Sequence, residues 1–241
     1  FYNFVQLFRD HAFINSLKVS FQFVGLVVSI ELIGGLVLAL ILINIKKFRG
    51  ILCSYLLIPP MLPMVAVGVI WLLLFSMYYG PINHVLSALL GIEPIPWTAS
   101  VKWSLWSVII ADVWQWTPFT MIIILAGLAS VPQDPLEAAI VDGASSTQRF
   151  FYVTLPLIKP VILVALIIRT VDAFKVFGLP LVMTGGGPGS ATEVLSLYVY
   201  RVGFKFWNLS YAAAISLFFL IIIIAIITAY VRLTAMEVRG R

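Results

Sequence analysis

The chain is dominated by long, nearly uninterrupted runs of apolar residues, separated by short polar connections. Runs of about 20 apolar residues are long enough for an α-helix to cross a bilayer. The runs lack the in-and-out alternation of an outer-membrane β-barrel, so helices are favoured over strands. The sequence therefore predicts an all-α integral membrane protein, a polytopic helical bundle forming one transmembrane domain over 1–241. Its five predicted spans are 16–44, 51–75, 104–128, 153–178 and 211–231.

Composition supports this prediction. Of the 241 residues, 62% are hydrophobic and 10% are charged, which is far from the composition of a soluble globular domain. The net charge of +5 comes from basic residues scattered along the chain, a pattern that does not indicate nucleic-acid binding. The single cysteine, Cys53, excludes an intramolecular disulfide.

The orientation of the spans follows from the distribution of Lys and Arg, because cytoplasmic connections carry the excess. The side that holds Lys47, Arg49 and Arg149 is the richer one. This bias places the C-terminus and the connection at 132–150 in the cytoplasm and the N-terminus outside. An external N-terminus needs something to carry it across the membrane, so we expect another span before Phe1, which gives six in total.

A polar segment between two apolar runs has the features of a docking element. Pro135 suits the first turn of a helix, Asp134 is the expected N-cap before it, and Glu137 lies near the positive end of the helix dipole. Gly143 allows the chain to turn, and a second short helix is expected over 144–149. Two short helices between membrane spans form a compact projection that fits a groove on a soluble partner.

Several motifs resemble those of known permeases. Glu137-Ala138-Ala139, Gly143 and Leu155-Pro156 match the cytoplasmic "EAA" loop of the permease subunits of bacterial ABC importers. The segments 184–188 (Thr-Gly-Gly-Gly-Pro) and 211–214 (Tyr-Ala-Ala-Ala) resemble carbohydrate permeases related to the maltose transporter. The first of them is typical of the larger of two partner permeases. The resemblance covers nearly the whole chain.

The resemblance implies a type I ABC importer permease in a bacterial or archaeal plasma membrane, with a carbohydrate (sugar or polyol) as substrate. It implies four kinds of partner: a second, homologous permease in a heterodimer, two ABC ATPase subunits, a soluble binding protein or lipoprotein, and membrane lipid. ATP is expected on the ATPase subunits, so this chain needs no cofactor. The implied ATPase-coupling residues are Glu137, Ala138, Ala139, Asp142, Gly143, Ala144 and Ser145.

The sequence shows no constellation typical of an enzyme or a metal site. The glycine-rich run at 184–190 lacks the Gly-Lys-Ser/Thr of a phosphate-binding loop and is predicted to be a tight external turn after a span. The two histidines, His11 and His84, are far apart, and no catalytic or metal-ligating motif is present. A non-catalytic transport subunit is therefore expected.

Charged residues inside the predicted spans are costly, about 2.5–3.5 kcal/mol each at the bilayer centre on insertion scales. Glu31, Asp112, Arg169, Asp172 and Lys175 are in this position. The last three are spaced three residues apart, which places them on one sector of a helix. This spacing is consistent with an intrahelical ladder of salt bridges and equally with a charged border of the translocation path.

The segment 112–118 combines a carboxylate, two indoles, an amide and the helix-breaking Pro118, a mixture that suits a sugar. Aromatic rings pack against the apolar faces of sugars, and amides and carboxylates bind their hydroxyls. The candidate substrate-pathway residues are Trp114, Gln115, Asp172, Phe174 and Lys175. If Gln115 makes no such contact, the start of the last span around Asn208 and Tyr211 is the next candidate.

Two further interpretations stay open at this stage. The bunched Pro59, Pro60 and Pro63 mark a bend in the second span, either as a hinge or as a tolerated irregularity. The rival function is an ion-coupled secondary transporter or channel that uses Asp172 and Lys175 as an ion relay. The rival explains the buried charges but leaves the complete docking loop unexplained, and the sequence shows no inverted repeat of broken helices.

Overall fold

The computed structural model describes residues 2–45 and 47–239, with the side chains of 233–239 excepted, and this part of the chain is helical without strands. The elements are α1 (Tyr2–Leu7), α2 (His11–Ile43), α3 (Arg49–Leu56), α4 (Ile58–Met61), α5 (Met64–Leu74), α6 (Pro81–Leu90), α7 (Val101–Ala129), α8 (Gln133–Val141), α9 (Ser146–Arg149), η1 (Phe150–Thr154), α10 (Leu155–Phe174), α11 (Gly178–Met183), α12 (Leu195–Tyr200), η2 (Arg201–Lys205) and α13 (Leu209–Arg239). The two η elements are single-turn π-helices.

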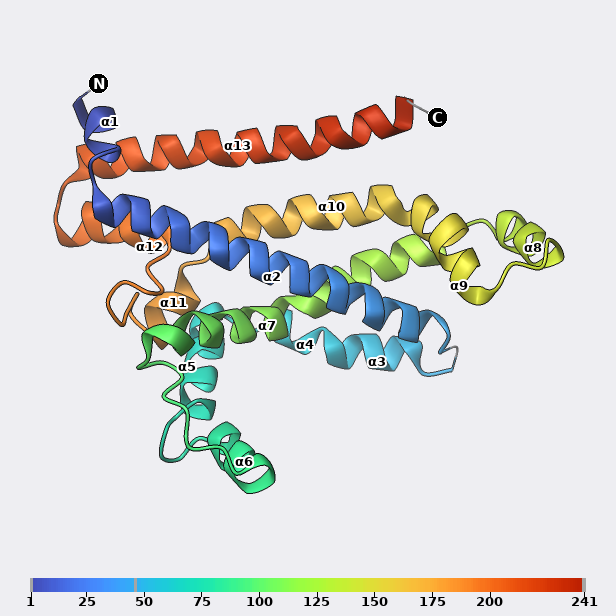
Figure 1. Ribbon diagram of the computed structural model, residues 1–241, viewed down its shortest axis with the longest axis horizontal. Helices are drawn as coiled ribbons and strands as arrows, with labels where there is room; N and C mark the ends of the chain where they lie inside the picture. Colours follow the sequence, from blue (N-terminus) through green and yellow to red (C-terminus); the bar gives the residue numbers. More distant parts are fainter. Residues whose placement is uncertain (1, 46, 240–241) are drawn as a thin grey trace.

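Four long helices, α2, α7, α10 and α13, run lengthwise through the molecule (Figure 1). The most extensive contact is between α2 and α7, and α10 packs against both. Glycines allow this close approach: a Cβ on Gly35 would lie 2.9 Å from the backbone nitrogen of Met121, and one on Gly127 would lie 2.8 Å from Val161. Helix α10, which carries Arg169 and Asp172, thus lies against α2 and α7, which carry Glu31 and Asp112.

Four segments are long and apolar enough to cross a membrane: His11–Ile43, Val101–Ala129, Ser146–Met183 and Leu209–Arg232. They correspond to the predicted spans at 16–44, 104–128, 153–178 and 211–231. The first begins five residues earlier than predicted, because Asp10 caps it by accepting hydrogen bonds from the amides of Ala12 and Phe13. Pro118 lies inside α7 without ending it.

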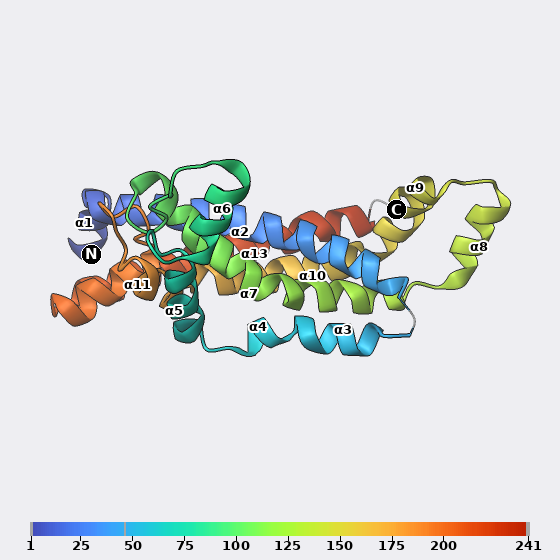
Figure 2. The same ribbon diagram turned by 90° about the horizontal axis from the view of Figure 1, so that it is seen from below.

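The segment predicted as a second, bent span at 51–75 forms three short helices instead of one bent helix. The prolines divide this segment into α3, α4 and α5, and Figure 2 shows α3 and α4 running alongside α7 before the chain turns into α5. Pro59 falls in the first turn of α4, and Leu62, directly before Pro63, is extended with ψ 141°. The proline-containing segment is therefore a helix break, sharper than the bend that the sequence predicted.

The two ends of the bundle differ in construction. The N-terminus and the chain at 184–195 lie at one end, called the outer end here, whereas α8, α9 and the C-terminal end of α13 lie toward the other (Figure 1). At the outer end, the side-chain amide of Asn15 donates to the carbonyl of Ser190 at 3.1 Å, and Ser20 Oγ accepts from the amide of Leu195 at 2.7 Å. The predicted tight turn at 184–190 follows the short helix α11, and Arg201 pairs with Glu193 at 2.9 Å beside it.

Candidate functional site

The polar segment at 132–150 forms two short helices joined by a sharp turn, the coupling loop of the prediction. The amide of Ala144 donates to the carbonyl of Ala139 at 2.9 Å and that of Gly143 to Ile140 at 3.0 Å, a pattern that ends α8 as a Schellman motif. Gly143 has φ +77°, which is costly for a residue with a Cβ. Because nothing lies within 4 Å of the position of such a Cβ, the backbone conformation explains this glycine within the chain.

The second helix of the coupling loop is fixed by a capping box. Ser145 Oγ accepts from the amide of Gln148 at 3.3 Å, and Gln148 Oε1 accepts from the amide of Ser145 at 2.8 Å. The prediction that Asp134 is the N-cap of the first helix is wrong by two residues. Helix α8 already begins at Gln133 after Pro132, so Asp134 lies in its first turn. There it still interacts favourably with the helix dipole.

The surface of the coupling loop is unusually open. The side chain of Val141 is 86% exposed, and that of Tyr152, just after the loop, is 79% exposed. Tyr152 lines a hollow of about 340 Å³ between α8 and the start of η1. Glu137 is exposed and makes no hydrogen bond or ion pair with the described residues. Ala138, Asp142 and Gly143 are exposed as well, so the loop presents small, apolar and acidic groups that the described residues do not cover.

A buried charge cluster joins the three packed helices α2, α7 and α10. Arg169 binds Glu31 through two hydrogen bonds of 2.6 and 2.9 Å and Asp112 through one of 3.0 Å. All three side chains are at most 2% exposed, and the guanidinium also lies 4.9 Å from the ring centroid of Trp116. The chain itself thus encloses and pairs this arginine.

The predicted ladder of Arg169, Asp172 and Lys175 is therefore wrong as a single intrahelical unit. Arg169 pairs across helices. Asp172 pairs with Lys175, the residue that caps the C-terminal end of α10, at 2.8 Å. That pair is open, with side-chain exposures of 36% and 60%. Helical spacing places the three on one sector, but the neighbours of that sector decide which charges meet.

The candidate substrate-pathway residues Gln115, Trp114 and Phe174 lie in different environments. Gln115 is fully buried, and its Nε2 donates to the carbonyl of Leu62 at 3.0 Å, while its Oε1 has no hydrogen-bond partner among the described residues. Trp114 is 40% exposed and packs edge-on against Trp71. Phe174 is buried between rings of α2 and α13. A substrate contact by Trp114, Gln115, Phe174, Asp172 or Lys175 stays a prediction.

Sequence reasoning missed two roles that depend on distant neighbours. Glu31 and Asp112 were recognised as intramembrane charges, but they were not paired with Arg169; the usable signal was that a buried arginine requires carboxylates. Gln115 was interpreted as a sugar ligand, whereas here it satisfies the carbonyl that the proline break releases. The signal for this role was the run of prolines, because a helix break leaves a backbone carbonyl that needs a donor from another helix.

Comparison with known proteins agrees with this architecture. Residues 32–235 match the family described as binding-protein-dependent transport system inner membrane component. The trehalose/maltose transport system permease protein MalF of Thermococcus litoralis is 41% identical over 227 residues, covering 93% of this chain and 75% of the relative.

Solved structures show the same arrangement of helices. A bacterial ABC transporter involved in the import of the acidic polysaccharide alginate is similar with a TM-score of 0.87 and 25% identity, covering 98% of this chain and 83% of that one. A bacterial alginate ABC transporter in complex with an alginate pentasaccharide-bound periplasmic protein is also similar, with a TM-score of 0.84 and 26% identity. The match covers 94% of this chain and 80% of that one.

Proposed function

This chain belongs to the family of binding-protein-dependent transport system inner membrane components, and from this membership we propose how it works as a carbohydrate permease. It is a multi-pass plasma-membrane protein, the membrane-spanning subunit of an ATP-driven ABC importer. The relatives named above transport sugars or a polysaccharide, which supports a sugar or polyol as its substrate. The chain moves this substrate across the membrane without changing its bonds.

The observation that carries the mechanism is the coupling loop. Its fold is fixed from within by the Schellman motif and the capping box, while Glu137, Val141 and Tyr152 are left uncovered. An ATPase subunit docks on this surface. When two such subunits close on ATP, the loop transmits the movement to α7 and α10, which flank it in the chain. ATP must bind the closed arrangement more tightly than the open one for this coupling to operate.

The subunit is non-catalytic and holds no cofactor in this proposal, since ATP is bound and hydrolysed by the partner ATPases. A second, homologous permease completes the translocation path as a heterodimer. A binding protein delivers the sugar to the outer end, a role supported by the alginate importer whose periplasmic protein carries a pentasaccharide. The buried charge cluster holds α2, α7 and α10 together, so that these three helices move as one unit.

The rival interpretation, an ion relay through Asp172 and Lys175, has less support. These residues neutralise each other in an exposed pair, and Arg169 is already enclosed by two carboxylates. Family membership and the coupling loop both favour ATP-driven transport.

Reconstitution tests the proposal directly. The complete complex of both permeases, the ATPases and the binding protein should accumulate a radiolabelled carbohydrate in proteoliposomes only when ATP is supplied on the ATPase side. Accumulation driven by an ion gradient without ATP would contradict the proposal. Failure of any ATPase to co-purify with this subunit would contradict it as well.

A further inference from the structure

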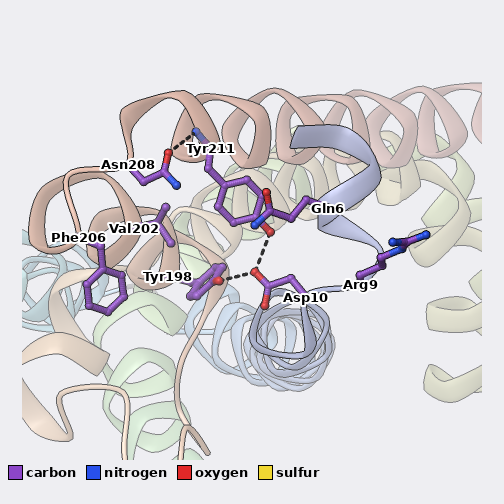
Figure 3. Close-up of a pocket in the computed structure, with 8 residues that line it drawn as sticks. All are labelled: Gln6, Arg9, Asp10, Tyr198, Val202, Phe206, Asn208 and Tyr211. Carbon is purple, nitrogen blue, oxygen red and sulfur yellow. Dashed lines mark hydrogen bonds between the residues drawn. The ribbon is translucent and has the colours of Figure 1, made fainter. Parts of the chain in front are cut away.

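A hollow of about 390 Å³ opens at the outer end of the bundle, between α1, the segment formed by α12 and η2, and the start of α13 (Figure 3). This volume lies at the lower end of the range typical of small-molecule sites, about 300–1,000 Å³. The hollow lies at the opposite end of the molecule from the coupling loop, and its lining is largely polar and aromatic. It coincides with the region around Asn208 and Tyr211 at the start of the last span.

The floor of the hollow is a fixed carboxylate with two phenols. Asp10 Oδ2 accepts hydrogen bonds from the hydroxyls of Tyr198 at 2.5 Å and Tyr211 at 2.7 Å. Burial alone would raise the pKa of Asp10, but these hydroxyls and the amides of Phe13 and Ala12 outweigh it, so the pKa is lowered and the carboxylate stays charged. Both phenol oxygens keep lone pairs that can accept further hydrogen bonds.

The rim of the hollow carries polar groups whose hydrogen-bonding capacity is not used by the residues that the structure describes. Gln6 is exposed, points toward Asp10 and Tyr211, and makes no side-chain hydrogen bond with the described residues (Figure 3). Asn208 Oδ1 accepts from the amide of Tyr211 at 3.2 Å, which leaves its NH₂ group without a partner in this part of the chain. The ring of Phe206, 69% exposed, flanks the opening. Two amides, a carboxylate and an exposed aromatic ring thus surround one concave space.

We propose that this hollow is an outer carbohydrate-binding site, where the sugar is held after delivery and before it enters the spans. The inference rests on the proposed function, because it assigns a place to the same class of substrate. Sugar hydroxyls accept from the amides of Gln6 and Asn208 and donate to the floor oxygens. An apolar face of the sugar ring packs on Phe206. The fixed floor means that little ordering is needed on binding, which favours affinity for a small ligand.

The test begins by identifying the transported sugar with ATP-dependent uptake by the complete importer, using a panel of radiolabelled mono- and disaccharides and polyols. That sugar is then the probe in equilibrium dialysis against the complex in nanodiscs, without the binding protein. Two variants remove one donor each: Gln6→Ala, and Asn208→Ser, which keeps an oxygen to cap α13. Asn3→Ala is the matched control, because it removes an amide from the same helix, α1, but does not line the hollow.

We expect Gln6→Ala and Asn208→Ser each to raise the Kd for the sugar about three- to tenfold, and Asn3→Ala to leave it unchanged. Unchanged Kd in both pocket variants, or no saturable binding by a complex that transports the sugar, would overturn the site while leaving the proposed function intact. Variants that keep the sugar Kd but weaken stimulation of the ATPase by loaded binding protein would mean that the hollow is a protein contact, which also overturns it. Absence of uptake for every carbohydrate in the panel would overturn the function together with the site.

Discussion

Glu31 and Glu137 are both acidic residues in a very apolar chain, and their surroundings are opposite. Glu31 is fully buried and bound through both carboxylate oxygens to Arg169. Glu137 is exposed and has no partner among the described residues. The first charge is neutralised by the chain itself, whereas the second is available to another protein. The difference separates a residue that holds the bundle together from one that is exposed for the proposed contact with an ATPase.

The same contrast holds for the regions around them. Helices α2, α7 and α10 are joined through the buried charge cluster by bonds between residues far apart in the sequence. The hydrogen bonds of the coupling loop join residues at most five positions apart. The internal hydrogen bonds give the loop its own fold, and its second helix leads directly through η1 into α10. A movement of the loop is therefore passed to the bonded bundle.

Removing the arginine of the buried charge cluster should have the largest effect on stability. Arg169→Leu leaves Glu31 and Asp112 buried without a counter-charge, and breaking a buried pair in this way costs about 3–5 kcal/mol. We expect strongly reduced membrane expression and a lower unfolding temperature in detergent, measured by fluorescence-detected size exclusion after heating.

The matched control removes the charges together. Arg169→Leu combined with Glu31→Gln and Asp112→Asn should recover much of the lost expression, because no uncompensated charge is left in the bundle. Equal instability of the single and triple variants would mean that the packing of the arginine side chain, and not its charge, holds the helices.

Replacing the glycine of the coupling loop should instead abolish transport in protein that still inserts. Gly143→Trp forces a bulky residue to φ +77°, a local cost of about 1–2 kcal/mol, and places an indole at the docking surface. Uptake should be lost and co-purification of the ATPase weakened at normal expression. Gly143→Asn, which tolerates this conformation, should retain part of the activity. Normal uptake with normal ATPase binding in Gly143→Trp would remove the coupling role.

The amide at the helix break tests whether Gln115 belongs to the bundle or to the substrate path. Gln115→Ala leaves the carbonyl of Leu62 without its donor, which costs about 1–3 kcal/mol for a buried group. We expect the unfolding temperature and uptake to fall together. Reduced uptake at limiting sugar with unchanged unfolding temperature would show instead that the side chain contacts the substrate.

The exposed glutamate should affect transport without affecting stability. Glu137→Ala removes no hydrogen bond or ion pair with the described residues, so expression and unfolding temperature should stay as in the wild type. Uptake should fall several-fold, as expected for the loss of one charge-assisted bond to the ATPase. Asp134→Ala is the matched control, since it removes a charge from the same helix, α8. Equal effects of the two substitutions would mean that negative charge on α8 in general, and not Glu137 in particular, supports transport.

The sequence was sufficient for features that depend on local patterns. Four of the five spans predicted from long apolar runs correspond to long apolar helices. The turn at Gly143 between two short helices was predicted from the glycine and its neighbours. Local patterns were insufficient for the second span. Prolines showed that the helix is disturbed, but they carried no information that Gln115, on another helix, satisfies the carbonyl of Leu62 at the break.

For the candidate site, too, local features could be predicted from the sequence and long-range contacts could not. The residues of the coupling loop follow one another in sequence, so a motif could find them. The partners of Arg169 lie 138 and 57 positions away, and spacing within a helix carries no information about which helix will be its neighbour. The pairing of Arg169 with Asp172 failed for this reason, while that of Asp172 with Lys175, one turn apart, was correct.

Asp172 gives the smallest expected change in stability and therefore the sharpest test of the substrate path. Its ion pair with Lys175 is open, and exposed pairs contribute about 0–1 kcal/mol, so Asp172→Asn should express and unfold nearly as the wild type does. If the pair borders the path, the variant should change the apparent affinity for the sugar or the preference between sugars in reconstituted complex. A loss of stability comparable to that of Arg169→Leu would place Asp172 in the buried charge cluster after all. Unchanged stability with unchanged transport kinetics would exclude the pair from the path and leave the outer hollow around Asn208 as the better supported sugar contact.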